Sequence, residues 1–234
     1  MEPDTAVVLP ALDEEAALPG VLRALPREGI REVVVVDNGS TDGTVRAARE
    51  AGATVVVEPR RGYGSACLAG VAHLARGAPP TFVAFLDADG SDDPTELPAL
   101  LAPLRAGCAD LVIGSRTLGT RERGALLPQA RVGNAVACAL LRVLYGQPAT
   151  DLGPFRAVRW DRLAALGMRD PAFGWTVEMQ ARAARARLVT VEVPVSYRRR
   201  IGRSKITGTV TGSVRAGAGI LSTLVRIRLG RGRR

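Results

Sequence analysis

The chain has 234 residues, of which 47% are hydrophobic and 24% charged, as in an ordinary globular protein large enough for one substantial core. Its three cysteines are far apart and form no CxxC pair, which argues against a disulfide scaffold or a thiolate zinc site and suits a reducing cytoplasm. The net charge is +9, the start does not resemble a signal peptide, and no apolar run approaches the roughly 20 residues of a membrane-spanning helix. We therefore expect a protein that is not integral to a membrane.

The first half of the chain alternates short apolar runs with amphipathic stretches. Strands are predicted over residues 5–9, 32–36, 53–57, 82–86 and 110–113. Helices are predicted between them, over residues 14–25, 44–51, 65–75 and 95–105. Because each strand is apolar almost throughout, both of its faces are expected to be covered. The alternation predicts an α/β fold, with a Rossmann-like, mostly parallel central sheet flanked by helices.

After about residue 114 this rhythm changes. Helices are predicted over residues 129–145 and 175–185, and strands over 154–158 and 188–195. No acidic residue follows Glu192, whereas eleven basic residues do, so the excess charge belongs to the C-terminal segment. We expect one domain over residues 1–206 and a basic, weakly amphipathic segment over 207–234. That segment either meets an anionic partner, such as lipid headgroups, a phosphorylated substrate or nucleic acid, or is a solvated tail.

Polar residues follow the predicted strands, where open α/β sheets bind their ligands. The first strand leads into Pro10-Ala11-Leu12-Asp13-Glu14, the second ends at Asp37, and the third leads to Gly62-Tyr63-Gly64. An acid at Asp37 is also typical of a dinucleotide-binding domain. Such a domain needs a glycine-rich phosphate turn after its first strand, and this chain has carboxylates there. The dehydrogenase interpretation is therefore excluded, although Asp37 can still bind a nucleoside.

The fourth strand ends in Asp87-Ala88-Asp89. Two carboxylates at this spacing can share a divalent cation, which prefers oxygen ligands and neutralises the charge of a leaving diphosphate. The alternative is that both acids only cap the helix that begins near Pro94. Because acids also follow neighbouring strands, the metal role is favoured.

Seven motifs, in order, resemble the family 2 glycosyltransferases of the GT-A fold, and polyprenyl- or dolichyl-phosphate mannosyl- and glucosyltransferases in particular. They are PALDE, VVVVDNGSTDGT, GYG, FLDADGSDDP, IGSR, DLGPFRA and GRSK, and they extend from about residue 5 to residue 206. The resemblance implies a GT-A fold. It also implies metal-dependent, inverting transfer of a sugar from a nucleotide-sugar donor to an acceptor, with polyprenyl phosphate at a membrane surface as the expected acceptor.

The resemblance further implies roles for individual residues. Those expected to bind the donor are Pro10, Ala11, Glu14, Asp37, Gly62, Gly64 and Asp87. Asp87 and Asp89 would bind Mg²⁺ or Mn²⁺, and Asp89 would be catalytic. Those expected to bind phosphate oxygens are Arg116, Arg131, Arg200, Ser204 and Lys205.

The chain departs from the family pattern at two places. It has Asp13 where the family usually has Asn, and Ser91 and Asp92 where mannosyl members often have Gln and His. These departures leave the third metal ligand open and favour a UDP-sugar over GDP-mannose. A phosphate acceptor needs no strong general base, but a hydroxyl acceptor does, and Asp151 and Glu178 are the candidates.

Three other functions are considered. A glycosyltransferase with a soluble hydroxyl acceptor fits the same motifs. A sugar nucleotidyltransferase would need a glycine-rich, basic loop after the first strand, which is absent. A nucleic-acid-binding protein would need aromatic residues among its charges, and the tail after Arg199 has none, so no specific nucleic-acid partner is expected.

We expect a cytoplasmic protein, peripheral on the inner face of the membrane, where the segment over residues 220–229 would lie in the interface.

Overall fold

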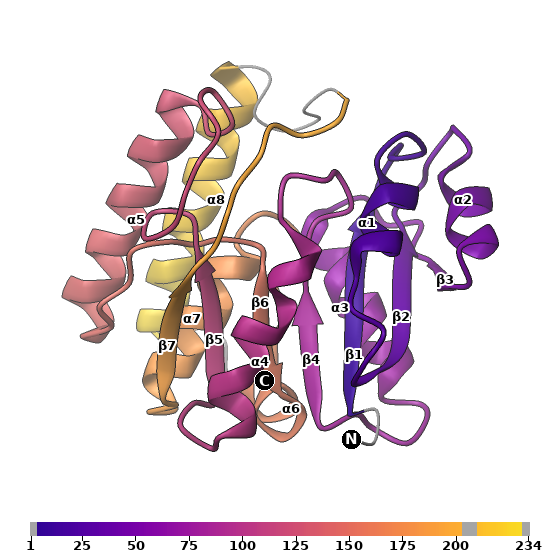
Figure 1. The fold of residues 1–234 in the computed structure, drawn as a ribbon. Helices are drawn as coiled ribbons and strands as arrows, with labels where there is room; N and C mark the ends of the chain where they lie inside the picture. The colour runs from indigo at the N-terminus through magenta and orange to yellow at the C-terminus, as the bar shows by residue number, and fades with distance from the viewer. Residues whose placement is uncertain (1–3, 203–209, 231–234) are drawn as a thin grey trace.

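The computed structural model describes residues 4–202 and 210–230 and is built on one seven-stranded sheet, in the order β3-β2-β1-β4-β6-β5-β7 (Figure 1). The strands are β1 (Thr5–Ala11), β2 (Ile30–Asp37), β3 (Thr54–Val57), β4 (Phe82–Phe85), β5 (Leu111–Ser115), β6 (Arg156–Arg159) and β7 (Thr190–Pro194). All neighbouring pairs are parallel except those of β6, which runs antiparallel between β4 and β5. The mostly parallel sheet that the sequence predicts is thus confirmed.

The helices of the first half cover the two faces of this sheet. They are α1 (Leu18–Ala24), α2 (Thr44–Glu50), α3 (Tyr63–Leu74) and α4 (Leu97–Arg105), the last preceded by a 3₁₀ turn, Pro94–Glu96. Alternate residues of one strand point to opposite faces. In β1, Val7 and Leu9 therefore join a core cluster with α1 and α4, while Ala6 and Val8 join a second cluster with α3. Burial on both sides explains why the strands are apolar nearly throughout.

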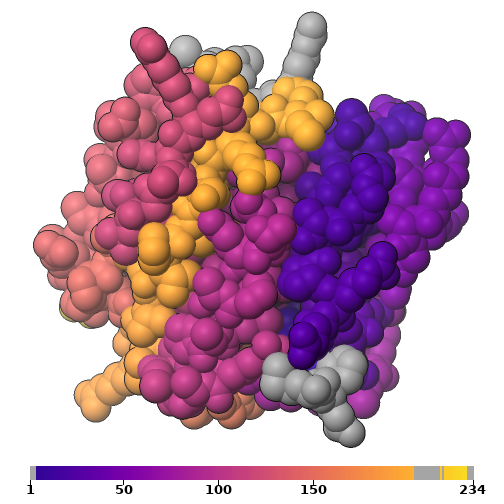
Figure 2. Space-filling view, in the orientation of Figure 1, coloured from indigo at the N-terminus to yellow at the C-terminus, as the bar shows by residue number. Residues whose placement is uncertain are grey.

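The second half adds α5 (Pro128–Tyr145), α6 (Trp160–Leu166), α7 (Trp175–Arg185) and α8 (Val210–Arg228). Helices α6 and α7 share the cluster of α3, and α5, α7 and α8 enclose a third cluster, centred on Leu141, Val177 and Leu224. In Figure 1, α5 and α8 stand side by side at the end of the molecule where β7 lies. The described part of α8 is thus packed into the fold, and Figure 2 shows the indigo N-terminal part and the magenta to orange remainder packed against each other.

Two elements differ from the sequence prediction. Helix α1 begins at Leu18 rather than at residue 14, because the backbone N–H groups of Glu14 and Glu15 donate to Thr44 at the start of α2 and to Asp42 in the loop before it. Helix α6 is not predicted. No described helix is both long enough and apolar enough to cross a membrane.

Candidate functional site

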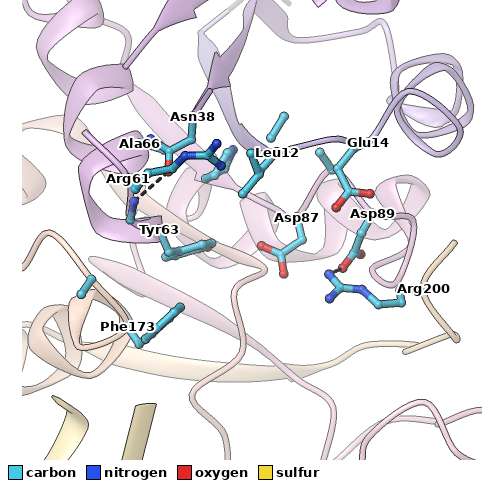
Figure 3. A pocket seen from close by; sticks show the side chains of 15 residues that line it. Leu12, Glu14, Asn38, Arg61, Tyr63, Ala66, Asp87, Asp89, Phe173 and Arg200 are labelled. Atoms are coloured by element: carbon cyan, nitrogen blue, oxygen red, sulfur yellow. Dashed lines mark hydrogen bonds and ion pairs between the residues drawn. The ribbon is translucent and has the colours of Figure 1, made fainter. Parts of the chain in front are cut away.

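A cavity of about 430 Å³ lies beyond the carboxyl ends of β1, β2 and β4 (Figure 3). Its lining includes five of the seven residues predicted to bind the donor, together with Asp89, predicted to bind the metal, and Arg200, predicted to bind phosphate. These residues are Pro10, Ala11, Glu14, Gly62, Asp87, Asp89 and Arg200. Asn38, Arg61, Tyr63 and Phe173 also line it, and the sequence prediction missed the first three. Tyr63, at the start of α3, and Phe173, in the loop before α7, lie on the same side of Asp87 in Figure 3.

The turn after β2 is held by two neighbouring side chains. The Asp37 carboxylate accepts hydrogen bonds from the backbone N–H groups of Ser40 (3.0 Å) and Gly39 (3.4 Å), and Asp37 is not among the cavity residues. Asn38 donates to the carbonyls of Glu58 and Arg60 and accepts from the Gly62 N–H at 2.8 Å. Asn38 therefore joins the ends of β2 and β3 and fixes the start of α3. A polar residue directly after a strand is the signal that could have identified it.

Asp13 connects the first two loops. Its φ is 51°, in the left-handed region that Asp and Asn tolerate better than most residues. Its carboxylate accepts from the Thr41 N–H at 2.6 Å and from the Thr41 hydroxyl at 3.2 Å. At this position the fold uses an acceptor, which a carboxylate supplies as well as an amide does.

Two acids, Asp87 and Asp89, line the floor of the cavity, and a third, Asp92, is hydrogen-bonded to the same loop. Asp89 and Asp92 are almost fully buried, and Asp92 accepts a hydrogen bond from the Asp87 N–H at 3.3 Å. Burial, followed by repulsion from Asp89, raises the pKa of Asp87 to about 7, against the attraction of Arg200 and Arg116. Burial, followed by the charges of Asp87 and Asp89, also raises the pKa of Asp92 well above its usual value. The cluster has more negative charge than its cations balance.

A segment after β7 supplies the cation nearest to these acids. Its backbone pairs with the loop of the acids, since Ile201 N–H donates to Asp89 O at 2.9 Å and Arg198 N–H donates to Ser91 O at 2.8 Å. The Arg200 guanidinium forms an ion pair with Asp89. This pairing raises the pKa of Arg200, although burial alone would lower it. Arg200 thus lies across the cavity floor, within reach of an anionic ligand.

The acid cluster fits a divalent cation. The Oδ1 atom of Asp92 is buried without a hydrogen-bond partner among the described residues, and the raised pKa of Asp87 reflects charge that a cation would balance. Over residues 4–202 and 210–230, no three His, Cys, Asp or Glu side chains are placed to hold a metal ion by themselves. An ion held by Asp87 and Asp89 would therefore complete its shell with oxygens of a ligand or water.

Arg116 and Asp151, two residues predicted from the sequence, are paired with each other. Arg116 donates to both carboxylate oxygens of Asp151, from Nε at 2.8 Å and from Nη2 at 2.6 Å, and it stacks on the Tyr197 ring. Burial alone would lower the pKa of Arg116, but the bonds and charge of Asp151 raise it. Arg116 lines a second cavity, of about 330 Å³, between α5 and α8. Both oxygens of the Asp151 carboxylate are engaged by Arg116.

The other predicted residues lie apart from the first cavity. Glu178 is buried and accepts from the N–H groups of Arg169 and Asp170 and from Arg182 Nε. Gly64 packs against the loop before α7, where a Cβ would come within 2.0 Å of the Asp170 carbonyl oxygen. Arg131 is exposed near the start of α5. Ser204 and Lys205 lie outside the described residues.

The protein has an α/β fold with a cavity beyond the carboxyl edge of a mostly parallel sheet, which is where such folds generally bind their ligands. Comparison with known proteins gives the family. Residues 6–158 match the model of glycosyl transferase family 2. The chain is 47% identical over 210 residues to an uncharacterized glycosyltransferase of Mycobacterium tuberculosis, covering 89% of this chain and 92% of that protein. The chain belongs to glycosyltransferase family 2.

Other relatives have named acceptors. The chain is 35% identical over 222 residues to the undecaprenyl-phosphate mannosyltransferase of Micrococcus luteus, covering 88% of each protein. It is also similar to the solved structure of glucosyl-3-phosphoglycerate synthase from Mycobacterium tuberculosis in complex with Mg²⁺ and UDP. That structure has a TM-score of 0.76 and 25% identity, over 98% of this chain and 80% of the other. The fold is therefore of the GT-A type, and the sequence prediction of a glycosyltransferase is confirmed.

Proposed function

We propose that this glycosyltransferase moves a sugar from a nucleoside diphosphate donor to a polyprenyl phosphate, with inversion at the anomeric carbon. The part of this proposal that concerns the donor, which we call the donor half, is supported by the first cavity, where Asp87, Asp89 and Arg200 meet at the carboxyl ends of the strands. Departures from the mannosyl pattern at Ser91 and Asp92 favour a UDP-sugar over GDP-mannose.

The cavity has a place for each part of the donor. The nucleoside fits beside Pro10, Ala11 and Asn38, and the diphosphate lies toward Asp89 and Arg200. A cation held by Asp87 and Asp89 would neutralise the charge that develops on the leaving diphosphate. Arg200 then leaves Asp89 and binds phosphate oxygens, which suit its planar guanidinium.

The acceptor half of the proposal is supported by the surface of α5 and α8. Valines 132, 136 and 143 of α5 and Leu221 and Val225 of α8 are large apolar residues between 43% and 78% exposed. Neither helix contains an acidic residue, and α5 carries the exposed Arg131 and Arg142 beside its valines. An apolar, cationic face without carboxylates suits an anionic lipid surface. We call these two helices with their exposed residues the α5–α8 face.

A phosphate acceptor also agrees with the pairing of Arg116 and Asp151. An acceptor that is already an anion needs no strong base, and both carboxylate oxygens of Asp151 and of Glu178 already accept hydrogen bonds from the protein. The second cavity is lined by Val136 and Leu221 of the α5–α8 face and by Arg116. Its apolar residues suit a lipid chain, and Arg116 suits the phosphate of such an acceptor.

The experiment is a screen of UDP- and GDP-sugars with Mg²⁺ or Mn²⁺, with undecaprenyl phosphate as acceptor. Labelled product should partition into the organic phase, and Asp89→Ala should lose it. Arg199→Gln is a suitable control, because Arg199 bonds to Arg123 O and Glu122 rather than to the acids of the cavity. Turnover without a divalent cation, or full activity of Asp89→Ala, would refute the donor half.

A second acceptor class is favoured by one comparison. A structure of glucosyl-3-phosphoglycerate synthase with phosphoglyceric acid has a TM-score of 0.78 and 26% identity, over 98% of this chain and 81% of that one. A small phosphorylated acceptor with a hydroxyl group is therefore the second candidate. Labelled product that stays in the aqueous phase with phosphoglyceric acid, and none with undecaprenyl phosphate, would select it.

A further inference from the structure

The loop between α6 and α7 forms one wall of the first cavity, to which Ala172 and Phe173 contribute. The same loop holds the start of α3. Its Pro171 carbonyl accepts from the Ser65 N–H at 2.9 Å, and its Ala172 carbonyl accepts from the Gly64 N–H at 3.2 Å. The position of this loop therefore sets both Phe173 and the first turn of α3.

Two buried carboxylates hold the loop in place. Glu178 Oε2 accepts from the N–H groups of Asp170 at 2.7 Å and Arg169 at 3.0 Å, and Asp170 Oδ1 accepts from the Ala172 N–H at 2.9 Å. Hydrogen bonds to a buried carboxylate are strong, and losing one leaves a charge partly unsatisfied. The loop is thus fixed by side chains rather than by regular secondary structure.

The second oxygen of Asp170 binds α8. Thr223 Oγ1 donates to Asp170 Oδ2 at 2.6 Å, and Arg226 Nη2 lies 3.3 Å from the same oxygen and donates to Thr223 Oγ1 at 2.9 Å. Asp170 and Thr223 are 6% and 1% exposed. A Cβ at Gly174 would come within 2.3 Å of Asp170 Oδ2 and 2.4 Å of Thr223 Oγ1, so this junction is closely packed. No described residue of α8 lines the first cavity, so Asp170 joins the helix to a site that it does not itself touch.

We propose that Asp170 is a positioning residue through which α8 sets the wall of the donor cavity. The proposal rests on the proposed function in that the cavity holds the donor. Thr223 and Arg226 fix one carboxylate oxygen, the other fixes Ala172, and the closely packed loop transmits the position of α8 to Phe173 and α3. Because such coupling is reciprocal, contact between the α5–α8 face and a surface changes donor affinity, and donor binding changes that contact.

The test removes one hydroxyl. Thr223→Val keeps the shape of the side chain and takes away the hydrogen bond to Asp170. Titration calorimetry with UDP and with GDP, each with Mg²⁺, should show the Kd of the bound nucleotide rising about fivefold or more. The KM for the donor should rise with it, while kcat at saturating donor stays within about twofold. Thr223→Ser should restore the wild-type values.

Tyr145→Phe is the matched control. Tyr145 donates to the Leu224 carbonyl at 2.6 Å, so this change removes one hydrogen bond that holds α8 to α5 without touching Asp170. Its nucleotide Kd should stay within about twofold of wild type. Equal increases of Kd in Thr223→Val and Tyr145→Phe would overturn the proposal, because they would mean that any loosening of α8 suffices. An unchanged Kd in Thr223→Val would also overturn it.

Hydrogen exchange without nucleotide separates this proposal from the donor assignment. The Gly64 and Ser65 amides donate to the loop before α7, and the Ala172 amide donates to Asp170. All three should exchange faster in Thr223→Val than in Tyr145→Phe. Equal protection of these amides from exchange in the two variants would refute the role of Asp170 in coupling α8 to the loop, whatever the nucleotide affinities are. Faster exchange in a protein that binds neither UDP nor GDP would support the junction and refute the proposed donor site.

Discussion

At the scale of single residues, the acids at the cavity floor are arranged at a cost to stability, as the proposed cation site would require. Asp87, Asp89 and Asp92 lie within one short loop, and burial together with mutual repulsion keeps the pKa of Asp87 near 7. A carboxyl group whose pKa is raised in the folded state prefers to be protonated there. Its ionisation therefore opposes folding, and the opposition grows as the pH rises from the ordinary pKa of 3.8 through 7.

The first prediction follows from this unfavourable effect of Asp87 ionisation on folding. Asp87→Asn mimics the protonated side chain, so in EDTA at pH 8 it should raise the free energy of unfolding by about 1–2 kcal/mol. The gain should shrink as the pH falls through 7 and vanish below about 3.8, which urea unfolding at several pH values can follow. Asp161→Asn changes an exposed acid and should alter stability by less than about 0.5 kcal/mol at any pH. A loss of stability in Asp87→Asn at pH 8 would contradict the interpretation.

The second prediction concerns Arg200, whose guanidinium holds Asp89 as a metal ion would. Arg200→Gln removes this competitor, so Mn²⁺ should bind several-fold more tightly without nucleotide, as measured by electron paramagnetic resonance titration. UDP affinity with the metal present should fall, because a phosphate partner is lost. Arg199→Gln should change neither affinity. Weaker Mn²⁺ binding in Arg200→Gln would mean that Arg200 does not compete with the cation.

At the scale of elements, the close contact between α3 and the loop before α7 explains a glycine that the sequence interpretation assigned to the donor. Gly64 lies in α3 at a point where a Cβ would be 2.0 Å from the Asp170 carbonyl oxygen, which is backbone and has little freedom to move. The glycine is required by protein packing, whatever its distance from the ligand.

The third prediction compares two helical glycines. Gly64→Ala should lower the free energy of unfolding by about 1–3 kcal/mol, because α3 must move away from the loop. Gly20→Ala, in α1 with open space around it, should raise it by about 0.5–1 kcal/mol, because alanine loses less backbone freedom on folding. Denaturant unfolding of both variants measures the contrast. Equal effects would show that the contact at Gly64 relaxes without cost.

The sequence predicts those elements whose cause is local. The strands of the first half are apolar runs because both faces are buried, and the acids that follow β4 are visible in the chain itself. The start of α1 is not predictable in this way, since the partners of Glu14 and Glu15 lie about 30 residues away. The pairing of Arg116 with Asp151, 35 residues apart, is equally invisible to local patterns.

The same distinction applies to orientation and to the site. The antiparallel direction of β6 depends on the route of the chain between α5 and α6, which no periodicity in residues 156–159 records. Asn38 and Phe173 become cavity residues only when β2 and the loop before α7 are brought to the same edge. The sequence thus predicts which strand ends carry polar residues, but not which side chains meet between them.

At the scale of the whole molecule, charge and apolar exposure are concentrated at one end of the sheet. The α5–α8 face lies at the end of the molecule where β7 lies, whereas β3 closes the opposite end (Figure 1). Helices α5 and α8 carry arginines and no acids, so an anionic surface would attract this end and bring the second cavity with it. The molecule would then dock in one orientation.

The fourth prediction tests that orientation with a pair of valines of similar exposure. Val132, on α5, is 65% exposed, and Val57, on β3 at the far end of the sheet, is 61% exposed. Val132→Asp removes apolar contact from the α5–α8 face and adds a repelled charge, so cosedimentation with phosphatidylglycerol vesicles should fall several-fold. Val57→Asp adds the same charge and should have little effect, because it stays about a Debye length or more from the docked surface. Equal losses in both variants would mean that net charge alone drives binding, and unchanged binding in both would exclude the α5–α8 face as the docking surface.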